Sequence, residues 1–360
     1  MKNFIFGALL LCILVGCKKD SKIKLKFLDE YVLTDSIQFK NTIIGGLSGV
    51  SYTNGKYYFV IDDARDPRFL IANILIKDDT FYSVNFKDVI HLKDSTELFY
   101  SENSLDLESI FVDESTNEIH FTSEGSIRNG RKPTVFKTDL SGNFITDYKL
   151  PVSFKNIYNI EHNAVFEAST KSFDKEGFWV AMEGVLKSDG AAPSFSSTSS
   201  PIRITYFDKK TNSATKQFAY ELEPIYKPAK GNINLNGVTA ILEYKENNFF
   251  IIERTYQNGY GFNGNSIRIF DASISEKTTN IITTESLKET AFIPLEKKLI
   301  LDFSDIKYNL TEEIIDNIEG ITFGPKLSNG SKSLLLVSDD NFQVYGKQLN
   351  QLILLEITSK

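Results

Sequence analysis

Cysteine is nearly absent from this 360-residue chain, since its two cysteines, Cys12 and Cys17, both lie near the N-terminus. The rest of the chain therefore has no thiol for a disulfide bond or a thiolate metal site. Histidine is also scarce, because His91, His120 and His162 are the only three and they are widely spaced. This argues against a histidine-rich zinc centre. A metal ion bound by this chain would need oxygen ligands.

Long apolar runs are also lacking, apart from residues 4–16. This run is shorter than the roughly 20 apolar residues of a membrane-spanning helix. It follows Lys2 and ends in Leu14-Val15-Gly16-Cys17, which is typical of a lipoprotein signal peptide. We expect cleavage after Gly16 and acylation of the Cys17 thiol. The alternative is an ordinary signal peptide with a chance cysteine.

The N-terminal pattern predicts a signal peptide at 1–16, a lipidated N-terminus and polar tether at 17–25, and one folded domain at 26–360. The lipid would anchor a cell-envelope protein that faces the periplasm and does not span the membrane. The formal net charge is −7, whereas a nucleic-acid-binding protein usually has a basic surface, so nucleic acid is not an expected partner. We expect a monomer that contacts the membrane only through its lipid.

Five segments of the chain share one pattern, in which a polar residue, a small residue and usually an aliphatic residue begin a strand. They start at Ser48-Gly49-Val50, Glu108-Ser109-Ile110, Glu167-Ala168-Ser169, Asn236-Gly237-Val238 and Glu319-Gly320-Ile321. After a turn, each enters a second apolar run that ends in an acid, at Asp62, Glu124, Glu183, Glu253 and Asp339. Two strands joined by a tight turn form a hairpin. The pattern therefore predicts five repeated hairpins.

Hairpins that recur in this way, with further strands between them, indicate an all-β fold made of one β-propeller. At about 60 residues per blade the chain has room for five or six blades, and we favour six. Pairing of residues 23–33 with residues 351–357 would close the last blade. The always-small second position fits the crowded innermost strands. A β-sandwich, the rival fold, would not explain the recurring acids. We expect an exposed loop at 188–201 and a short helix near 311–315.

Equivalent positions of successive blades lie in a ring at one mouth of a propeller, so the repeated acids should gather there. This acidic ring would contain Glu108, Glu167, Glu319, Asp62, Asp63, Glu124, Glu183, Glu253, Asp339 and Asp340. Crowded carboxylates raise one another's pKa unless a cation lies among them. Calcium accepts 6–8 oxygen ligands in flexible geometry, so Ca2+ is the expected cofactor. The alternative is a structural belt in which the acids bond neighbouring backbone amides.

Three arginines, Arg65, Arg68 and Arg254, accompany these acids and could bind a phosphate or carboxylate through their planar forks. Ion pairing with the neighbouring acids is the alternative role for each of them. The sequence has no recognisable motif for a nucleophilic serine, since the segment Gly45–Gly49 does not satisfy G-x-S-x-G in any register. The expected ligand is thus a small anionic ester or phosphate.

Several of these segments resemble the phytase-like domain family, which is also described as having esterase-like activity of phytase. The motifs that carry the resemblance include Gly46-Leu47-Ser48-Gly49, Asp106-Leu107-Glu108-Ser109-Ile110, Met182-Glu183-Gly184, Asp316-Asn317-Ile318-Glu319-Gly320-Ile321 and Ser338-Asp339-Asp340-Asn341-Phe342. The resemblance extends from about residue 45 to residue 355. It implies hydrolysis of phosphate esters such as phytate, but it supplies no defined set of catalytic residues.

Three functional hypotheses remain open from the sequence. The first is a calcium-dependent phosphate-ester hydrolase in which Glu108 or Glu319 activates a water and the three arginines orient the substrate. The second is a non-catalytic envelope propeller that binds a ligand or a protein and uses calcium only for structure. The third is a hydrolase of carboxylic esters.

Overall fold

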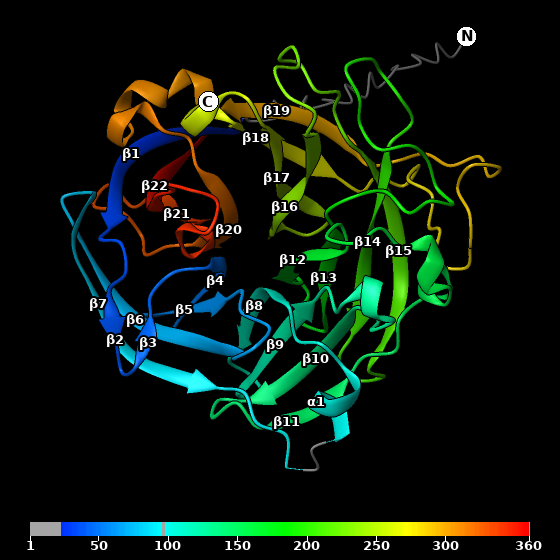
Figure 1. Cartoon of the computed structure of the whole chain (residues 1–360), viewed down its shortest axis with the longest axis horizontal. Coiled ribbons are helices and arrows are strands. Elements are labelled where there is room, and N and C mark those ends of the chain that lie inside the picture. Colours follow the sequence, from blue (N-terminus) through cyan, green and yellow to red (C-terminus); the bar gives the residue numbers. More distant parts are fainter. Residues whose placement is uncertain (1–22, 96–97, 360) are drawn as a thin grey trace, which may run out of the picture.

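The computed structural model describes residues 23–95 and 98–359, which form a β-propeller of five blades around a central axis (Figure 1). Blade 1 contains β4 (Leu47–Thr53), β5 (Lys56–Ile61), β6 (Arg68–Lys77) and β7 (Thr80–His91). Blade 2 contains β8 (Leu107–Asp113), β9 (Glu118–Ser123), β10 (Thr134–Asp139) and β11 (Phe144–Asp147). Blade 3 contains β12 (Phe166–Lys171), β13 (Gly177–Met182), β14 (Pro201–Asp208) and β15 (Ser213–Glu221). Blade 4 contains β16 (Asn234–Lys245), β17 (Asn248–Gln257), β18 (Asn265–Ser273) and β19 (Glu296–Asp302).

The two ends of the chain meet in blade 5, which contains β20 (Asn317–Phe323), β21 (Lys332–Asp339), β22 (Asn350–Ser359) and β1 (Ile23–Leu33). β1 pairs antiparallel with β22 along its length, from Ile23 opposite Ser359 to Leu33 opposite Asn350. The predicted closure by residues 23–33 and 351–357 is therefore confirmed. Because β1 is the outer strand of this blade, its pairing with β22 joins the two ends of the chain and closes the propeller.

The predicted all-β propeller is confirmed, but the expected count of six blades is wrong. The residues that a sixth blade would need lie instead in long connections, chiefly 183–200 between β13 and β14 and 274–295 between β18 and β19. The first of these includes the serine-rich segment that we expected to be a loop.

Helices are few and short among the described residues. The one α-helix there, α1 (Leu98–Glu102), was not predicted, and the helix expected near 311–315 is a 3-10 turn at Thr311–Glu313. The other 3-10 turns are Ile127–Asn129, Val152–Phe154, Ile157–Asn159, Gly261–Asn263, Phe303–Asp305, Lys307–Asn309 and Asn341–Gln343. A small hairpin of β2 (Gln38–Phe39) and β3 (Thr42–Ile43) precedes blade 1.

The hydrophobic core lies between neighbouring blades, where both faces of each inner sheet are covered. All residues of β8 and β13 are buried, for example, because each strand lies between two adjacent blades. The innermost strands touch one another around the axis and leave room only for small side chains. A Cβ at Gly49 would lie 3.0 Å from the Glu108 carbonyl oxygen, and one at Gly320 would lie 2.4 Å from Val337 Cγ1. The axis is consequently closed to anything larger than about one water molecule.

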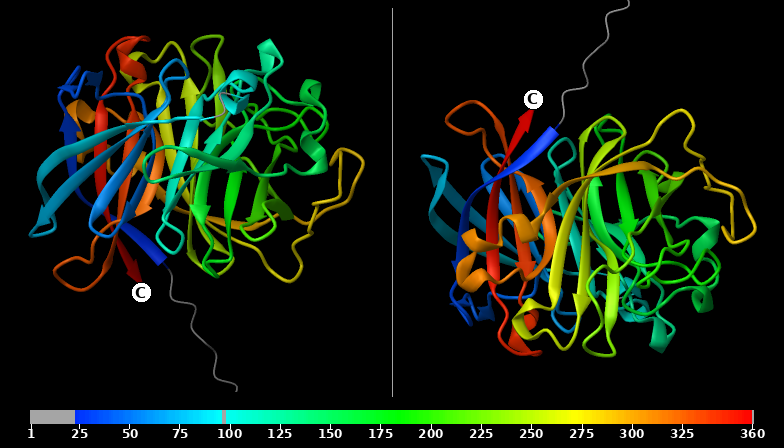
Figure 2. Two further views of the ribbon diagram at one scale, coloured as in Figure 1. Left: turned by 90° about the horizontal axis from the view of Figure 1, so that it is seen from below. Right: turned by 90° about the horizontal axis from the view of Figure 1, so that it is seen from above.

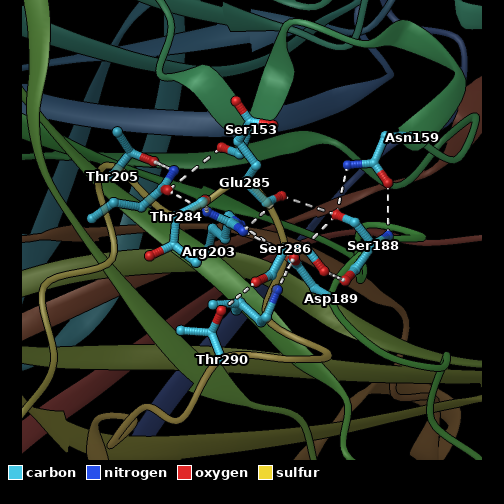
Figure 3. Close-up of polar contacts among 12 residues, drawn as sticks. Ser153, Asn159, Ser188, Asp189, Arg203, Thr205, Thr284, Glu285, Ser286 and Thr290 are labelled. Atoms are coloured by element: carbon cyan, nitrogen blue, oxygen red, sulfur yellow. Dashed lines mark hydrogen bonds and ion pairs between the residues drawn. The ribbon is translucent and has the colours of Figure 1, made fainter.

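The long segment 274–295 covers the outer edge of blade 3 and is held by a buried ion pair (Figure 3). Arg203 on β14 forms two hydrogen bonds with Asp189, of 2.6 and 2.9 Å, and neither side chain is exposed. The guanidinium also donates to the Thr284 carbonyl oxygen at 2.8 Å, while Asp189 accepts from the Leu287 amide. The exposed edge of β15 is thereby blocked from pairing with another chain.

Replacing Arg203 with methionine should destabilise the protein by about 3–5 kcal/mol, because it leaves the Asp189 carboxylate buried and uncompensated. Denaturant unfolding followed by circular dichroism measures the change. Lys347→Met, which removes an exposed ion pair with Glu312, is the matched control and should cost less than about 1 kcal/mol. Equal effects of the two substitutions would contradict this account of the segment.

Candidate functional site

Each blade has a β-bulge where its first strand pairs with its second, and the bulged residue points toward the axis. The register breaks between Leu47/Gly49, Leu107/Ser109, Phe166/Ala168, Val238/Ala240 and Ile318/Gly320. The residues left unpaired are Ser48, Glu108, Glu167, Thr239 and Glu319. A bulge re-aims a side chain at a strand end. It therefore places three glutamates around one mouth of the propeller.

The second strand of each blade also contributes a residue to this mouth. It is the residue that directly follows the one paired with the first-strand residue just before the bulge. By register these residues are Asp62, Glu124, Glu183, Arg254 and Asp339. Blade 4 thus differs from the repeat read in the sequence. Its equivalent residues are Thr239, Ala240 and Arg254, whereas the sequence pattern selected Asn236, Gly237 and Glu253. An arginine replaces the fifth acid of the ring.

Glu253 is a structural acid and does not join the ring. Its buried carboxylate accepts hydrogen bonds from Tyr220 Oη at 2.8 Å, Asn236 Nδ2 at 2.8 Å and the Glu223 amide at 3.0 Å. Lys297 Nζ lies 2.8 Å away and completes an ion pair. Strand alternation explains the difference, because Glu253 and Arg254 are neighbours and point to opposite faces of β17.

Four other residues expected at the mouth have other roles. Asp63 pairs with Arg65, which is 92% exposed, and with Arg68, which is buried and also donates to Thr42. Asp340 accepts hydrogen bonds from Gly46 N, Gln343 Nε2 and Asn350 Nδ2, and so fastens the loop after β21 to blade 1. The structure therefore brings neither Arg65 nor Arg68 into the ring, and Arg254 is the arginine that belongs to it.

Arg254 spans blades 3 to 5 and holds two of the ring glutamates. Its Nη2 donates to Glu183 Oε1 at 2.7 Å and its Nη1 donates to Glu319 Oε1 at 2.9 Å. Asn317 Nδ2 donates to the same Glu319 oxygen at 2.8 Å, and Asn317 Oδ1 accepts from Arg254 Nη1. The Arg254 Nε–H is buried and has no hydrogen-bond partner. This donor is enclosed by protein, so the two Nη groups carry the contacts of Arg254 at the mouth.

The carboxylates of the mouth, including Glu183 and Glu319, form three overlapping groups. Within each group, one oxygen of each residue lies within 4.8 Å of the others. The groups are Asp62, Asp106 and Glu108; Glu108, Glu167 and Glu319; and Glu124, Glu167 and Glu183. Sequence reasoning missed Asp106, although it lies two residues before Glu108 at the position that Asn317 occupies before Glu319. Its carboxylate lies near that of Asp62, whose pKa is raised well above normal by burial and by the charge of Asp106.

Glu108 and Glu167 are the least compensated members of the ring. Each is only 7% exposed, and neither carboxylate accepts a hydrogen bond from another described residue. Burial raises the pKa of Glu108 well above its usual range, with added repulsion from Asp62 and Glu167. Burial likewise raises the pKa of Glu167, and repulsion from the Glu183 and Glu124 carboxylates adds to the effect. Neither residue has an oxygen among the fully enclosed unpartnered atoms of the described residues, so these carboxylates are open to solvent or to a cation at the mouth.

The same physical cause acts on the other ring acids. Burial and the Glu183 carboxylate raise the pKa of Glu124 to about 8, although the Val165 amide donates to it at 2.6 Å. Burial also raises the pKa of Glu319 to about 8, and Arg254 only partly offsets the effect. Burial and Glu319 raise the pKa of Asp339 well above normal. Arg254 itself is buried, but the surrounding glutamates raise its pKa and keep it charged.

The donor set fits a hard divalent cation. Every candidate ligand is a carboxylate oxygen, and Glu108 and Glu167 are the residues that two groups share. Arg254 bonds Glu319 and Glu183, one member of each of two groups, and bonds no member of the group Asp62, Asp106 and Glu108. Calcium tolerates such a loosely arranged set of oxygens better than magnesium does. Asp62, Asp106 and Glu108 on blades 1 and 2, with Glu124, Glu167 and Glu183 on blades 2 and 3, are the residues able to hold it.

Comparison with known proteins identifies one family. The sequence model of the family described as "Phytase-like: Esterase-like activity of phytase" matches residues 42–342 of the chain. The search of curated proteins found no match to the chain.

Several solved structures match most of the chain at low similarity. A protein from Lactobacillus plantarum is 10% identical with a TM-score of 0.34, and the match covers 87% of this chain and 88% of that one. An exo-1,5-alpha-L-arabinanase from a bovine ruminal metagenomic library is 9% identical with a TM-score of 0.41, covering 90% and 99%. A xylan beta-1,4-xylosidase from Bacillus halodurans is 9% identical with a TM-score of 0.43. The match covers 89% of this chain but only 54% of that one. These scores are too low to support any argument about chemistry.

Proposed function

The chain belongs to the phytase-like family, and from this premise we propose that it is a calcium-dependent hydrolase of phosphate esters whose active site is the acidic ring. The observation that carries the proposal is the pair Glu108 and Glu167, two buried carboxylates with no hydrogen-bond partner among the described residues. A fold does not retain such groups for stability alone, because apolar residues would cost less. They are explained by a ligand that brings positive charge.

The cation and Arg254 would have complementary roles in this site. A bound calcium ion would neutralise the negative charge of a phosphate ester and so favour attack at phosphorus. Arg254 is fixed by its bonds to Glu183 and Glu319, and its side chain is 16% exposed. Its guanidinium charge at the mouth would attract and orient an anionic substrate.

Glu319 is the residue best placed to act as the general base. Arg254 and Asn317 both bond its Oε1, which leaves Oε2 without a protein donor and able to accept a proton from water. The water oxygen then forms the new bond to phosphorus while the bond from phosphorus to the alcohol oxygen breaks. Glu319 takes the water proton, and the leaving oxygen departs with the bonding electron pair and takes a proton from solvent to give the alcohol. Glu108, which has no such anchor, serves as an oxygen ligand for the cation.

The hairpin of blade 4 rises beyond the ring and supplies an apolar wall. Because side chains alternate along a strand, Tyr256 lies on the same face of β17 as Arg254, and Leu235 is its cross-strand neighbour on β16. Both side chains are exposed. A wall of this kind suits the organic part of an aryl phosphate, whereas a polyanion such as phytate would need more cations than Arg254 and the metal.

The test is phosphate release from an aryl phosphate and from phytate, using the soluble chain that begins at Lys18, in calcium and in chelator. We expect calcium-dependent release that is faster for the aryl phosphate. Failure to release phosphate from either substrate, by protein shown to be folded, would contradict the proposed reaction. Hydrolysis of an aryl acetate in the same experiment, without phosphate release, would favour the carboxylic-ester alternative.

Attachment to a membrane through Cys17 would orient the molecule. Cys17 lies outside the described residues, among which no helix is long and apolar enough to cross a membrane. β1 begins at Ile23 beside the end of β22, on the face opposite to the acidic ring (Figure 2). Five residues separate Cys17 from Ile23, so that face would lie within about 20 Å of the lipid. We propose that the ring faces away from the membrane, toward the periplasm.

Cys17→Ala should prevent acylation and move the protein from the membrane fraction to the soluble fraction. Fractionation of the producing cells, with the full-length chain, measures the distribution. Cys12→Ala is the matched control and should leave the protein in the membrane fraction. Equal distribution of the two variants would contradict the lipid anchor.

A further inference from the structure

The face opposite to the acidic ring has a cavity of about 710 Å³ that the proposed reaction does not use. It lies where the innermost strands end, and Val50, Ile110, Leu242 and Ile321 contribute to its apolar lining. The small residues around the axis separate it from the ring, and the cavity between them is only about 10 Å³, room for about one water molecule. The cavity and the ring therefore open on different faces and cannot share one substrate molecule.

The acids in the wall of the cavity are already neutralised by other groups. Asp113 pairs with Lys209 at 2.6 Å, and Glu114 pairs with Lys171 at 3.3 Å. Glu243 accepts hydrogen bonds from Trp179 Nε1 and from the amides of Phe173 and Asn247. These partners leave the wall with little unsatisfied polarity. The surface offered to a ligand is consequently mostly apolar.

One turn of blade 3, between β12 and β13, presents two groups that are not used by the protein. Phe173 is 55% exposed although it lines the cavity. Lys175, two residues further along the same turn, forms no ion pair with any described residue. An exposed ring next to an unpaired ammonium group suits a ligand that carries an anionic group on an apolar body.

We propose that this cavity is a second binding site, for a small amphiphile with an apolar acyl or aromatic body and one anionic group. The body lies on the apolar floor and against Phe173, and the anionic group contacts Lys175. The inference does not depend on the proposed hydrolase activity, because the two sites lie on opposite faces. Binding at the cavity requires no calcium.

The experiment is calorimetric titration of the chain from Lys18, in chelator, with 1-anilinonaphthalene-8-sulfonate and with decanoate. We expect one saturable site per chain for each probe, with competition between the two. Decyltrimethylammonium, which has the same apolar body as a decyl amphiphile but a cationic group, should bind at least about tenfold more weakly. Phe173→Ala and Lys175→Glu should each weaken binding of the sulfonate about tenfold.

Two matched variants on other parts of the surface serve as controls, Phe195→Ala and Lys155→Glu, and neither should change the affinity. Lys175 is exposed, so Lys175→Glu tests the site even if Phe173→Ala folds poorly. Glu319→Gln should bind the probes like the native chain whether or not it hydrolyses esters. No saturable binding, or equal effects of the cavity variants and their controls, would overturn the proposal.

Discussion

Glu319→Gln should lower the turnover of an aryl phosphate by about 10²–10⁴-fold, because the amide cannot accept the proton from water. The substitution keeps the shape of the side chain, and its amide oxygen can still accept from Arg254 and Asn317. Burial already penalises the charge of Glu319, as its raised pKa of about 8 shows. The neutral variant should therefore be at least as stable as the native chain without metal. Steady-state kinetics and thermal unfolding measure the two effects.

The matched control for this substitution is Glu313→Gln, six residues earlier, where the side chain is exposed. It makes the same chemical change outside the ring and should leave both turnover and stability unchanged. If Glu319→Gln retained more than about a tenth of the native turnover, Glu319 would not be the general base, and Glu108 would be the next carboxylate to test.

Without metal, the protein should become less stable as the pH rises from about 5 to 8. Burial and repulsion raise the pKa of Glu124 and Glu319 to about 8 in the folded chain, compared with 4.5 in the unfolded chain. The folded state therefore holds protons that unfolding releases in this range, so the free energy of unfolding falls as the pH increases. We expect a loss of at least about 3 kcal/mol, or roughly 5 °C in Tm.

Calcium should reverse this dependence on pH. Above about pH 8 the ring acids are ionised and bind the cation, so calcium should raise the Tm by several degrees there. At pH 5 the protons compete with calcium, and the increase should be small. Thermal unfolding at pH 5 and pH 8, in calcium and in chelator, provides the four measurements. A Tm that does not depend on calcium at pH 8 would contradict a cation site in the ring.

The sequence predicts the main features of the fold because the same packing constraints produce the same residue pattern in each blade. A small residue is required wherever an innermost strand approaches the axis, and the bulged residue at the mouth is polar in every blade. These constraints recur in each blade, so Gly49, Ser109, Ala168 and Gly320 are recognisable without a structure. The number of blades is less accessible, since long connections such as 274–295 take up residues without adding strands.

The fourth blade shows where reading a pattern fails. Gly237 appears to be the small residue of the repeat, but it is small because a Cβ there would lie 2.6 Å from Glu183 Cγ. The true equivalent is Ala240, and the register of β16 with β17 moves Arg254 into the ring in place of Glu253. A shift of one residue exchanges the two faces of a strand, so an error in register changes the chemistry assigned to it.

Contacts between distant segments explain the other differences. Asp106 joins the ring through its neighbour Asp62 on another blade, and Arg68 is removed from it by Asp63 and Thr42. Such pairings depend on loop conformations that a local pattern does not specify. The cavity on the opposite face is likewise formed by all five blades together and leaves no motif in the sequence.

The most direct test of the account is calorimetric titration of calcium into the metal-free chain at pH 8, compared with the double variant Glu108→Gln/Glu167→Gln. An equally charged control, Glu276→Gln/Glu289→Gln, changes two exposed acids outside the ring. We predict that the native chain and the control bind calcium at a saturable site and that the ring variant does not. Equal binding by all three proteins, or no binding by the native chain, would contradict the assignment of the acidic ring as a cation site.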